Sequence, residues 1–170
     1  MRFAAVIVLH NSARELTALL ESIDAHLAFR PQVICADSGS SDDGADVARE
    51  WGAEVVVMDG NPGYGAANNA ALELVSEEVT VLLNPDSLLI DGGIVRLAEA
   101  ARAGRALVAP KLLNDDRSVQ DSAHPLPGGR DGYLAALTVP RLLPATLRNR
   151  LQPFRSTTRT EVGWAIGACL

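Results

Sequence analysis

Asp86 is the residue whose type and position most clearly suggest chemistry, because it follows the apolar stretch 79–83 in the tripeptide Asn84-Pro85-Asp86. Carboxylate oxygens are preferred ligands of Mg²⁺ and Mn²⁺, and such ions commonly join one or two carboxylates to substrate phosphates. Pro85 restricts the turn, and Asn84 is placed to hydrogen-bond a ribose or a metal-bound water. We interpret Asp86 as a candidate metal ligand, with an ordinary turn or helix cap as the alternative.

A second carboxylate, Asp37, ends the apolar stretch 32–36 and is followed by Ser38 and other small residues. A carboxylate at the carboxyl edge of a strand is well placed to accept the NH group of a pyrimidine base. Farther along the loop, Ser41 or Asp42 can accept hydrogen bonds from the first NH groups of the following helix. The loop is therefore either part of a nucleotide site or a helix cap.

The loop at 63–68, with the sequence GYGAAN, nearly matches a dinucleotide-binding fingerprint but lacks its third glycine. Gly65 would let the backbone approach a ligand closely, and the N-terminus of the following helix would favour negative charge. Asn68 and Asn69 have poor helix propensity and good hydrogen-bonding reach. They favour a ligand role over the alternative, a tight turn with ordinary capping.

Other residues argue against several chemistries. The two cysteines, Cys35 and Cys169, have neither a disulfide framework nor a metal-ligand spacing, and we interpret them as buried small hydrophobes. His10 follows an apolar run, where a lone histidine is more often a satisfied polar residue than a catalyst. No Gly-x-Ser-x-Gly elbow supports a serine hydrolase, and nothing suggests a zinc site.

Alternating apolar runs and amphipathic segments must position these loops. We expect strands at 3–9, 32–36, 54–58, 79–83 and 106–110. We expect helices at 13–27, 43–51, 64–75 and 93–103. The alternation predicts an α/β fold, a mostly parallel sheet flanked by helices in a single domain. Ligands of such sheets bind beyond the carboxyl ends of the strands, where the polar loops lie.

Composition limits the class of protein further. The 170 residues are 48% hydrophobic with only 4% aromatic residues, which suits one domain with a Val, Leu, Ile and Ala core. The net charge of −6 argues against a nucleic-acid binder. No run reaches the roughly 18 apolar residues of a membrane span. Residues 1–9 lack the features of a signal peptide, so we expect a cytoplasmic protein.

The pattern changes in the last third of the chain. Residues 1–129 carry 9 basic and 19 acidic groups, whereas 130–160 carry six arginines against Asp131 alone. We expect a turn at 115–117 and a short antiparallel strand at 118–123. Pro140 and Pro144 break the apolar stretch 133–147 into, at best, two short helical pieces.

Four motifs together resemble the donor-binding motifs of family 2 glycosyltransferases with a GT-A fold, most closely the rhamnosyltransferase-like branch. They are VIVLHNS at 6–12, ADSGSSDDG at 36–44, NPGYGAANNAAL at 61–72 and LLNPDS at 82–87. The resemblance covers residues 3 to 123, and GWAIGACL at 163–170 is similar to the family's next strand. It implies a donor-binding domain at 1–123, a variable insertion or linker at 124–160, and the start of a further strand at 161–170.

The resemblance implies that a nucleoside-diphosphate sugar, such as dTDP-rhamnose or a UDP-sugar, binds over the carboxyl edge of the sheet. The implied donor-binding residues are His10, Asn11, Ser12, Asp37, Ser38, Gly65, Asn68, Asn69, Asn84 and Asp86. Asn84-Pro85-Asp86 stands where the family usually has an Asp-x-Asp motif, so Asp86 alone remains as the carboxylate for Mg²⁺ or Mn²⁺.

The implied reaction is displacement at the anomeric carbon by an acceptor hydroxyl, with inversion, in bacterial cell-surface polysaccharide or glycolipid synthesis. The acceptor would be a saccharide or a lipid-linked saccharide, deprotonated by a carboxylate base. In the family this base lies on a later segment, beyond Leu170. We therefore assign no catalytic residue to the chain and expect donor binding with little or no transfer.

Two further partners follow as hypotheses. Arginines and apolar residues alternate in 130–160, which suggests contact with a lipid-linked acceptor or an anionic membrane surface at the inner face. The alternative is a solvated or disordered linker. An apolar terminus at Leu170 would expose a strand edge, which suggests association into a homodimer.

Two competing functions remain open on the sequence. A Rossmann-type NAD(P)-binding domain is suggested by Gly63-x-Gly65 with Asp86 about 20 positions farther on. The missing third glycine argues against this alternative, as do the two complete βα units that precede Gly63. The other alternative is a non-catalytic nucleotide-binding or dimerisation module.

Overall fold

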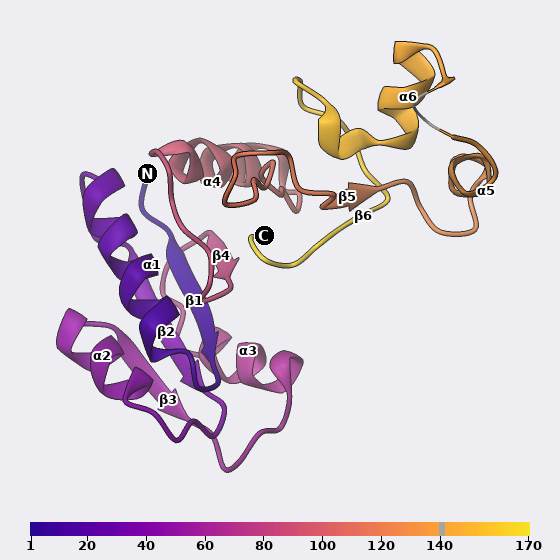
Figure 1. The fold of residues 1–170 in the computed structure, drawn as a ribbon. Coiled ribbons are helices and arrows are strands. Elements are labelled where there is room, and N and C mark those ends of the chain that lie inside the picture. Colours follow the sequence, from indigo (N-terminus) through magenta and orange to yellow (C-terminus); the bar gives the residue numbers. More distant parts are fainter. Residues whose placement is uncertain (140–141) are drawn as a thin grey trace. The chain divides into compact units, whose positions relative to one another are not determined.

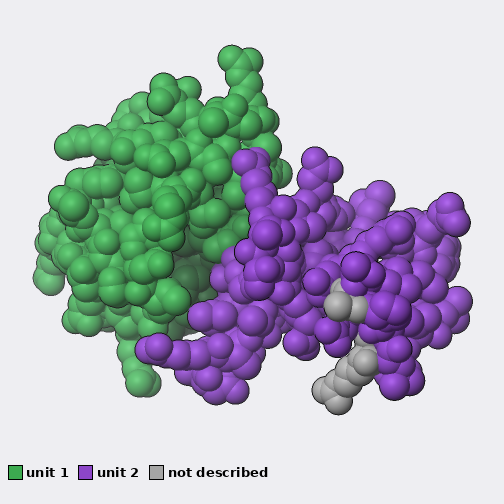
Figure 2. Space-filling view, turned by 90° about the horizontal axis from the view of Figure 1, so that it is seen from above, with its two compact units in different colours: residues 1–110, 167–170 green, residues 111–166 purple. Residues whose placement is uncertain are grey.

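The computed structural model describes residues 1–139 and 142–170. The chain divides into two compact units (Figure 2). Unit 1 comprises Met1–Pro110 and Gly167–Leu170, and unit 2 comprises Lys111–Ile166. Each unit has its own elements and is described by itself.

The described part of unit 1 is built on a four-stranded parallel sheet with the strand order β3-β2-β1-β4 (Figure 1). The strands are β1 Ala4–Leu9, β2 Gln32–Asp37, β3 Glu54–Val57 and β4 Thr80–Leu83. The register places Leu9 of β1 opposite Asp37 of β2, and Ile7 opposite Leu83 of β4. β1 and β2 are buried almost throughout, as expected for apolar runs in a sheet covered on both faces. These strands confirm four of the five predicted.

Helices follow these strands as predicted, and the α/β fold is confirmed. They are α1 Ala13–His26, α2 Gly44–Trp51, α3 Tyr64–Leu72 and α4 Gly93–Gly104. Because crossovers between parallel strands are right-handed, the reversal of direction after β3 puts α3 on the face opposite α1 and α2. Two alanines of α3 pack in a cluster with side chains of β1 and β2: Val6, Ile34, Ala36, Ala67 and Ala71.

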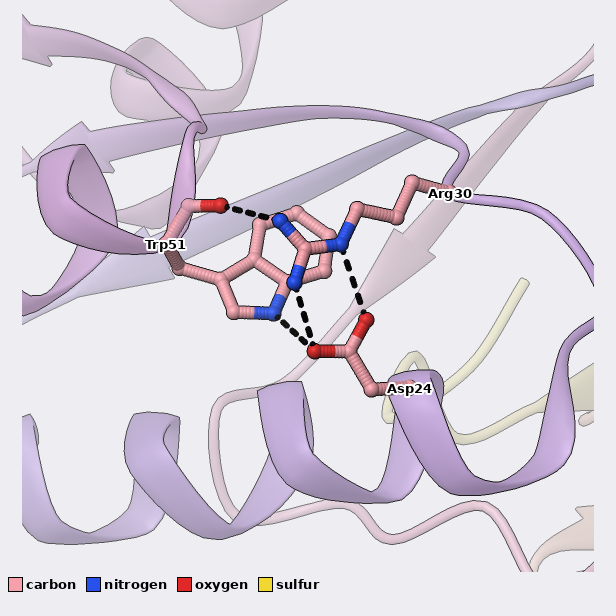
Figure 3. Close-up of polar contacts among 3 residues, drawn as sticks. All are labelled: Asp24, Arg30 and Trp51. Atoms are coloured by element: carbon pink, nitrogen blue, oxygen red, sulfur yellow. Dashed lines mark hydrogen bonds and ion pairs between the residues drawn. The ribbon is translucent and has the colours of Figure 1, made fainter.

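A polar cluster joins α1 to α2 through the segment before β2 (Figure 3). The Arg30 guanidinium donates to both carboxylate oxygens of Asp24, at 3.0 and 2.8 Å, and to the Trp51 carbonyl at 2.8 Å. It also lies 4.4 Å from the centroid of the Trp51 ring, whose Nε1 donates to Asp24 at 2.9 Å. These contacts, led by the hydrogen bond from Arg30, hold the pKa of Asp24 below its usual value.

Helix α3 ends at Leu72, three residues before the predicted end at 75. The residues that follow are held by the Gln32 side chain at the start of β2. Its amide nitrogen donates to the Leu74 carbonyl at 2.9 Å, and its amide oxygen accepts from the Ser76 backbone at 2.9 Å. A contact with another element, rather than helix propensity, therefore sets the geometry after this helix.

The predicted strand at 106–110 is wrong. The position beside β4 is taken by the last residues of the chain, where Leu82 N donates to Leu170 O at 2.8 Å and Leu170 N donates to Leu82 O at 3.1 Å. The next pair along, Leu83 and Cys169, forms an antiparallel bridge. Because the backbone groups on this side of β4 are used, 106–110 finds no partner there, and Leu107 is 90% exposed.

The described part of unit 2 consists of short elements. They are β5 Ala123–His124, α5 Arg130–Leu137, α6 Ala145–Leu151, the 3₁₀ helix Pro153–Arg155 and β6 Trp164–Ala165. β5 pairs with β6 in an antiparallel ladder. The predicted turn at 115–117 is present, closed by a bridge between Leu113 and Val119. The predicted strand at 118–123 is wrong, because within the described residues Val119 forms an isolated bridge and only Ala123 of this segment belongs to a strand, β5.

The two helical pieces predicted in 133–147 are α5 and α6, with shifted bounds. Pro144 stands at the N-cap of α6, where its missing NH costs no helical hydrogen bond. The other helix breaker, Pro140, lies outside the described residues.

Both cysteines are buried and free, as predicted. Burial raises the pKa of the Cys35 thiol to about 12 and that of Cys169 to about 11. Both thiols are therefore protonated at neutral pH and act as small apolar groups. Within 1–139 and 142–170, no helix has the length and apolar character needed to cross a membrane.

Candidate functional site

The candidate site lies at the carboxyl edge of the sheet in unit 1. Because β2, β1 and β4 are parallel neighbours, the loops that follow them begin at the same edge (Figure 1). Seven of the ten predicted donor-binding residues are at these strand ends or in the loops that follow them: His10, Asn11, Ser12, Asp37, Ser38, Asn84 and Asp86. The other three, Gly65, Asn68 and Asn69, lie on α3.

The loop after β1 is tied to the loop after β2. Nδ1 of His10 lies 2.9 Å from the Ser38 carbonyl oxygen, a contact that is a hydrogen bond when Nδ1 carries the proton. The Asn11 side-chain oxygen accepts from Ser41 N at 2.8 Å and from Ser41 Oγ at 3.0 Å. Ser12, which is buried, accepts from His10 N at 3.2 Å. In the structure these polar groups therefore hold the two loops together.

Asp37 is buried, with only 6% of its surface exposed, although it carries a carboxylate. Its Oδ1 accepts from Ser40 N at 3.0 Å, and its backbone oxygen accepts from Met58 N at 2.9 Å. Oδ2 has no hydrogen-bond partner among the described residues. The side chain is thus fixed at the strand end with one oxygen left to accept a further hydrogen bond.

The loops after β2 and β3 approach each other closely. Ser38 Oγ donates to Asn61 Oδ1 at 3.0 Å, and the same oxygen accepts from Gly63 N at 3.1 Å. Gly39 has a φ of +73°, and a Cβ added there would lie 2.9 Å from the carbonyl carbon of Gly60. Glycine is required at this position both by the backbone conformation and by the space.

Asp42 connects the first turns of two helices. Its Oδ1 accepts from Gly44 N of α2 at 3.2 Å, as the capping interpretation expects. Its Oδ2 accepts from Ala13 N of α1 at 2.8 Å, a contact that sequence reasoning missed. No local signal could have revealed the second bond, because 29 residues separate its partners.

The structure distinguishes the two asparagines of α3. Asn68 is buried and its Nδ2 donates to the Tyr64 carbonyl at 2.9 Å, whereas Asn69 is exposed. Oδ1 of Asn68 is buried and has no partner among the described residues. A buried acceptor without a partner costs about 1–3 kcal/mol, so a donor from a ligand or a water would offset a real penalty.

The turn after β4 is supported by the end of the chain. Asn84 N donates to Ala168 O at 2.9 Å, and Ser87 Oγ donates to the same carbonyl at 3.2 Å. The Asp86 side chain is exposed, and its carboxylate has no hydrogen-bond or ion-pair partner within the described residues. No hydrogen bond in this part of the chain joins Asn84 or Asp86 to the loops after β1 and β2.

Asp86 suits one mode of cation binding and not another. The described residues contain no group of three or more His, Cys, Asp or Glu arranged to hold a metal ion. A single unpaired carboxylate fits a cation that also takes oxygens from substrate phosphates and from water, as Mg²⁺ usually does. It does not fit an ion held by protein ligands alone.

A shallow hollow of about 400 Å³ lies beside the first turns of α1 and α2. Its lining residues are Asn11, Ala13, Arg14, Glu15, Thr17, Asp42, Asp43 and Val47. Asn11 is the one predicted donor-binding residue among them. Because Asp37, Asn68 and Asp86 do not line it, we do not take this hollow as the predicted site.

Comparison with known proteins identifies the family. The sequence model described as Glycosyl transferase family 2 matches residues 4–160, which is most of the chain. The chain therefore belongs to glycosyl transferase family 2. The match includes both the predicted donor-binding loops of unit 1 and the basic segment of unit 2.

Sequence relatives support this assignment. An uncharacterized glycosyltransferase of Mycobacterium tuberculosis and one of Mycobacterium bovis are each 33% identical to the chain over 98 residues. The match covers 58% of this chain and 43% of each relative, so the matched region is less than half the length of these curated relatives.

Solved structures share the fold. S. aureus TarS 1–349 in complex with UDP-GlcNAc matches with a TM-score of 0.59 and 22% identity over 76% of this chain and 42% of that one. The mannosyltransferase PcManGT from Pyrobaculum calidifontis, in complex with GDP-Man and Mn²⁺, matches with a TM-score of 0.52 and 21% identity. That match covers 78% of this chain and 37% of the other. At these identities the likeness establishes the GT-A fold.

Proposed function

We propose that this chain is the donor-binding part of a glycosyltransferase that uses a nucleoside-diphosphate sugar. The observation that carries the proposal is Asp37, a buried carboxylate fixed at the carboxyl edge of the sheet in a member of glycosyl transferase family 2. The structural neighbours TarS and PcManGT, in complex with UDP-GlcNAc and GDP-Man, support this class of donor.

Asp37 and Asn68 would bind the nucleoside. Oδ2 of Asp37 has no partner among the described residues and would accept the NH group of a pyrimidine base. The unpaired Oδ1 of Asn68 would accept a further NH or a ribose hydroxyl. Both groups are acceptors, so they favour ligand atoms that donate hydrogen bonds.

The loops around them would position the donor. Ser38 and His10 keep the loops after β1 and β2 together, with Asn11 and Ser12 in the same network. A Cβ added at Gly65 would meet open space, so the start of α3 would allow the phosphates to approach its backbone. Asn69 and Asn84 would line the same side of the donor.

Asp86 would hold Mg²⁺ or Mn²⁺ together with the donor diphosphate. When bound, the cation would stabilise the negative charge of the departing nucleoside diphosphate. The Mn²⁺ in the PcManGT complex supports this proposal. The negative charge of unit 1 supports it as well. With 7 basic and 16 acidic residues, unit 1 would repel a diphosphate in the absence of a cation.

The sugar and the acceptor are proposed more broadly. A UDP-sugar or dTDP-rhamnose is the proposed donor, since Asp37 suits a pyrimidine base. The proposed acceptor is a hydroxyl of a saccharide or of a lipid-linked saccharide in cell-surface polysaccharide or glycolipid synthesis. These proposals follow from the resemblance to the rhamnosyltransferase-like branch.

Calorimetric titration tests the donor site without requiring turnover. UDP, dTDP, GDP and NAD are titrated into the chain with Mn²⁺ and with EDTA. We expect UDP or dTDP to bind with Mn²⁺ and to bind weakly in EDTA. NAD binding without metal would support the dinucleotide-binding alternative instead, and absence of all binding would support a non-catalytic module.

Two variants assign the roles within the site. Asp86→Asn should weaken binding in Mn²⁺ and leave the residual binding in EDTA unchanged, whereas Asp37→Asn should reduce the preference for pyrimidine over guanine nucleotides. Asp46→Asn, which alters an exposed ion pair on α2, is the matched control. If the control and the site variants have equal effects, the site assignment is wrong.

A further inference from the structure

Unit 2 exposes an unusual concentration of large apolar side chains. Five of them within residues 126–142 are at least 60% exposed: Leu126, Tyr133, Leu137, Val139 and Leu142. Leu137 and Leu142 reach 84% and 83%. Single exposed apolar residues need no explanation, but a concentration of them commonly marks an interaction surface.

Helix α5 carries two of these exposed side chains, Tyr133 and Leu137, on one side. Arg130, Tyr133 and Leu137 are spaced three and four residues apart, so they lie on one side of the helix. Asp131 points elsewhere, because it accepts from Arg150 of α6 at 2.7 Å. The Asp131–Arg150 ion pair therefore joins α5 to α6 on a different side from the one that carries Tyr133 and Leu137.

The same region has an excess of positive charge. Residues 130–160 contain six arginines, and their only acidic residue, Asp131, is already paired with Arg150. Arg130, Arg155 and Arg159 are exposed. The local charge is therefore opposite in sign to that of the chain as a whole, which is −6.

This combination selects among the classes of partner. A nucleic acid would use the arginines but would leave the leucines in water. An apolar protein surface would cover the leucines but would not need the arginines. An anionic lipid surface uses both, because apolar side chains enter the acyl boundary while arginines meet the headgroups.

We propose that the exposed apolar side chains of 126–142 and the exposed arginines of 130–160 form a membrane-contact surface for anionic phospholipids. This basic apolar surface binds peripherally and reversibly. The inference does not depend on the donor site, because no donor-binding residue belongs to it. It would bring the chain to the surface on which a lipid-linked acceptor lies.

Vesicle co-sedimentation of the full chain tests the proposal. The vesicles contain phosphatidylcholine alone or phosphatidylcholine with phosphatidylglycerol, and each is tested at low and high salt. We expect binding to the vesicles that contain phosphatidylglycerol and weakening of that binding by salt. Equal binding to both kinds of vesicle, or none to either, would overturn the proposal.

Paired variants separate the two parts of the surface. The Arg155→Gln and Arg159→Gln double variant should lose about fivefold in partitioning per arginine at low salt. The Leu137→Ser and Leu142→Ser double variant should weaken binding at high salt as well, where charge contributes little. All four positions are exposed, so circular dichroism should show an unchanged fold.

The matched control changes the same residue types in unit 1. Leu107, at 90% exposure, is replaced by Ser, and Arg96, whose side chain is 75% exposed, by Gln. This control should bind vesicles like the unchanged chain, and an equal loss of binding would overturn the assignment of the surface to unit 2.

Sedimentation velocity completes the test. Self-association that the unit 2 variants abolish, without vesicle binding, would make the surface a contact between copies and would also overturn the proposal.

Discussion

The two units differ in charge and in how they bury apolar residues. Unit 1 has 7 basic and 16 acidic residues, whereas unit 2 has 8 basic and 5 acidic ones. Among the described residues, nearly all buried hydrophobic side chains belong to unit 1, and unit 2 contributes Leu151 and Phe154. A parallel sheet with long-range register thus positions the loops of the proposed donor site, and short elements carry the side chains of the proposed basic apolar surface.

Large apolar side chains therefore lie in two different environments in this chain. In unit 1 the leucines and valines fill a core that fixes polar loops at one sheet edge. In unit 2 several of them remain exposed, in a segment that also contains exposed arginines. Sequence hydrophobicity alone does not distinguish these uses, because exposure depends on what packs against each side chain.

Leucine truncation should show the largest contrast between the units. Leu19 of α1 is fully buried, so Leu19→Ala should lower the free energy of unfolding by about 2–5 kcal/mol. Leu137→Ala, at an exposed position of α5, should change it by less than about 0.5 kcal/mol. Urea unfolding followed by circular dichroism measures both. Equal losses would mean that Leu137 is packed and would also weaken the proposed membrane surface.

A glycine pair should give the next largest effect. Gly39 and Gly128 have similar φ values, +73° and +78°, but only Gly39 has backbone atoms close to an added Cβ. We expect Gly39→Ala to cost about 2–3 kcal/mol, since conformational strain and displacement of the Gly60 backbone add together. Gly128→Ala should cost about 1 kcal/mol from strain alone. The same urea titration checks this, and equal costs would contradict the close approach of the two loops.

Asn68 should separate stability from binding in unit 1. Asn68→Leu removes the hydrogen bond to Tyr64 but also removes a buried unpaired oxygen, so the free energy of unfolding should change by at most about 1 kcal/mol. Nucleotide affinity should fall about tenfold, or about 1.4 kcal/mol. Asn69→Leu, at an exposed position of the same helix, should leave the free energy of unfolding nearly unchanged. Unchanged affinity in Asn68→Leu would remove this residue from the site.

The Asp24 cluster should give the smallest effect. Because Arg30 lowers the folded-state pKa of Asp24, the pair stabilises the fold above the unfolded pKa of about 3.9 and loses this contribution as pH falls through the lower folded value. The Asp24 side chain is 40% exposed, so Asp24→Asn should cost less than about 1 kcal/mol at neutral pH. Thermal unfolding of the unchanged chain and of Asp24→Asn, measured between neutral and acidic pH, should show their difference in stability disappearing as pH falls. A difference that stays constant with pH would contradict the stabilising role of the Asp24–Arg30 pair.

Much of unit 1 could be predicted from the residues because its signals are local. Val, Ile and Leu runs predicted β1 to β4, and the amphipathic segments between them predicted the four helices. The positions of Asp37 at the end of β2 and of Asp86 in the turn after β4 followed from the same runs. The failure at 106–110 has a different cause, because that run is apolar and of strand length but its place beside β4 is occupied by Gly167–Leu170.

By itself, the sequence determined the α/β class, the family and the loops that carry polar side chains, since periodicity and motifs depend on neighbouring residues. Tertiary structure alone decided which polar groups have hydrogen-bond partners within the protein and which side chains are exposed. It buried Asn68 and exposed Asn69, joined Asp42 to two helices, and left Leu137 in water. These outcomes depend on contacts between residues far apart in the chain, for which a single sequence contains no local signal.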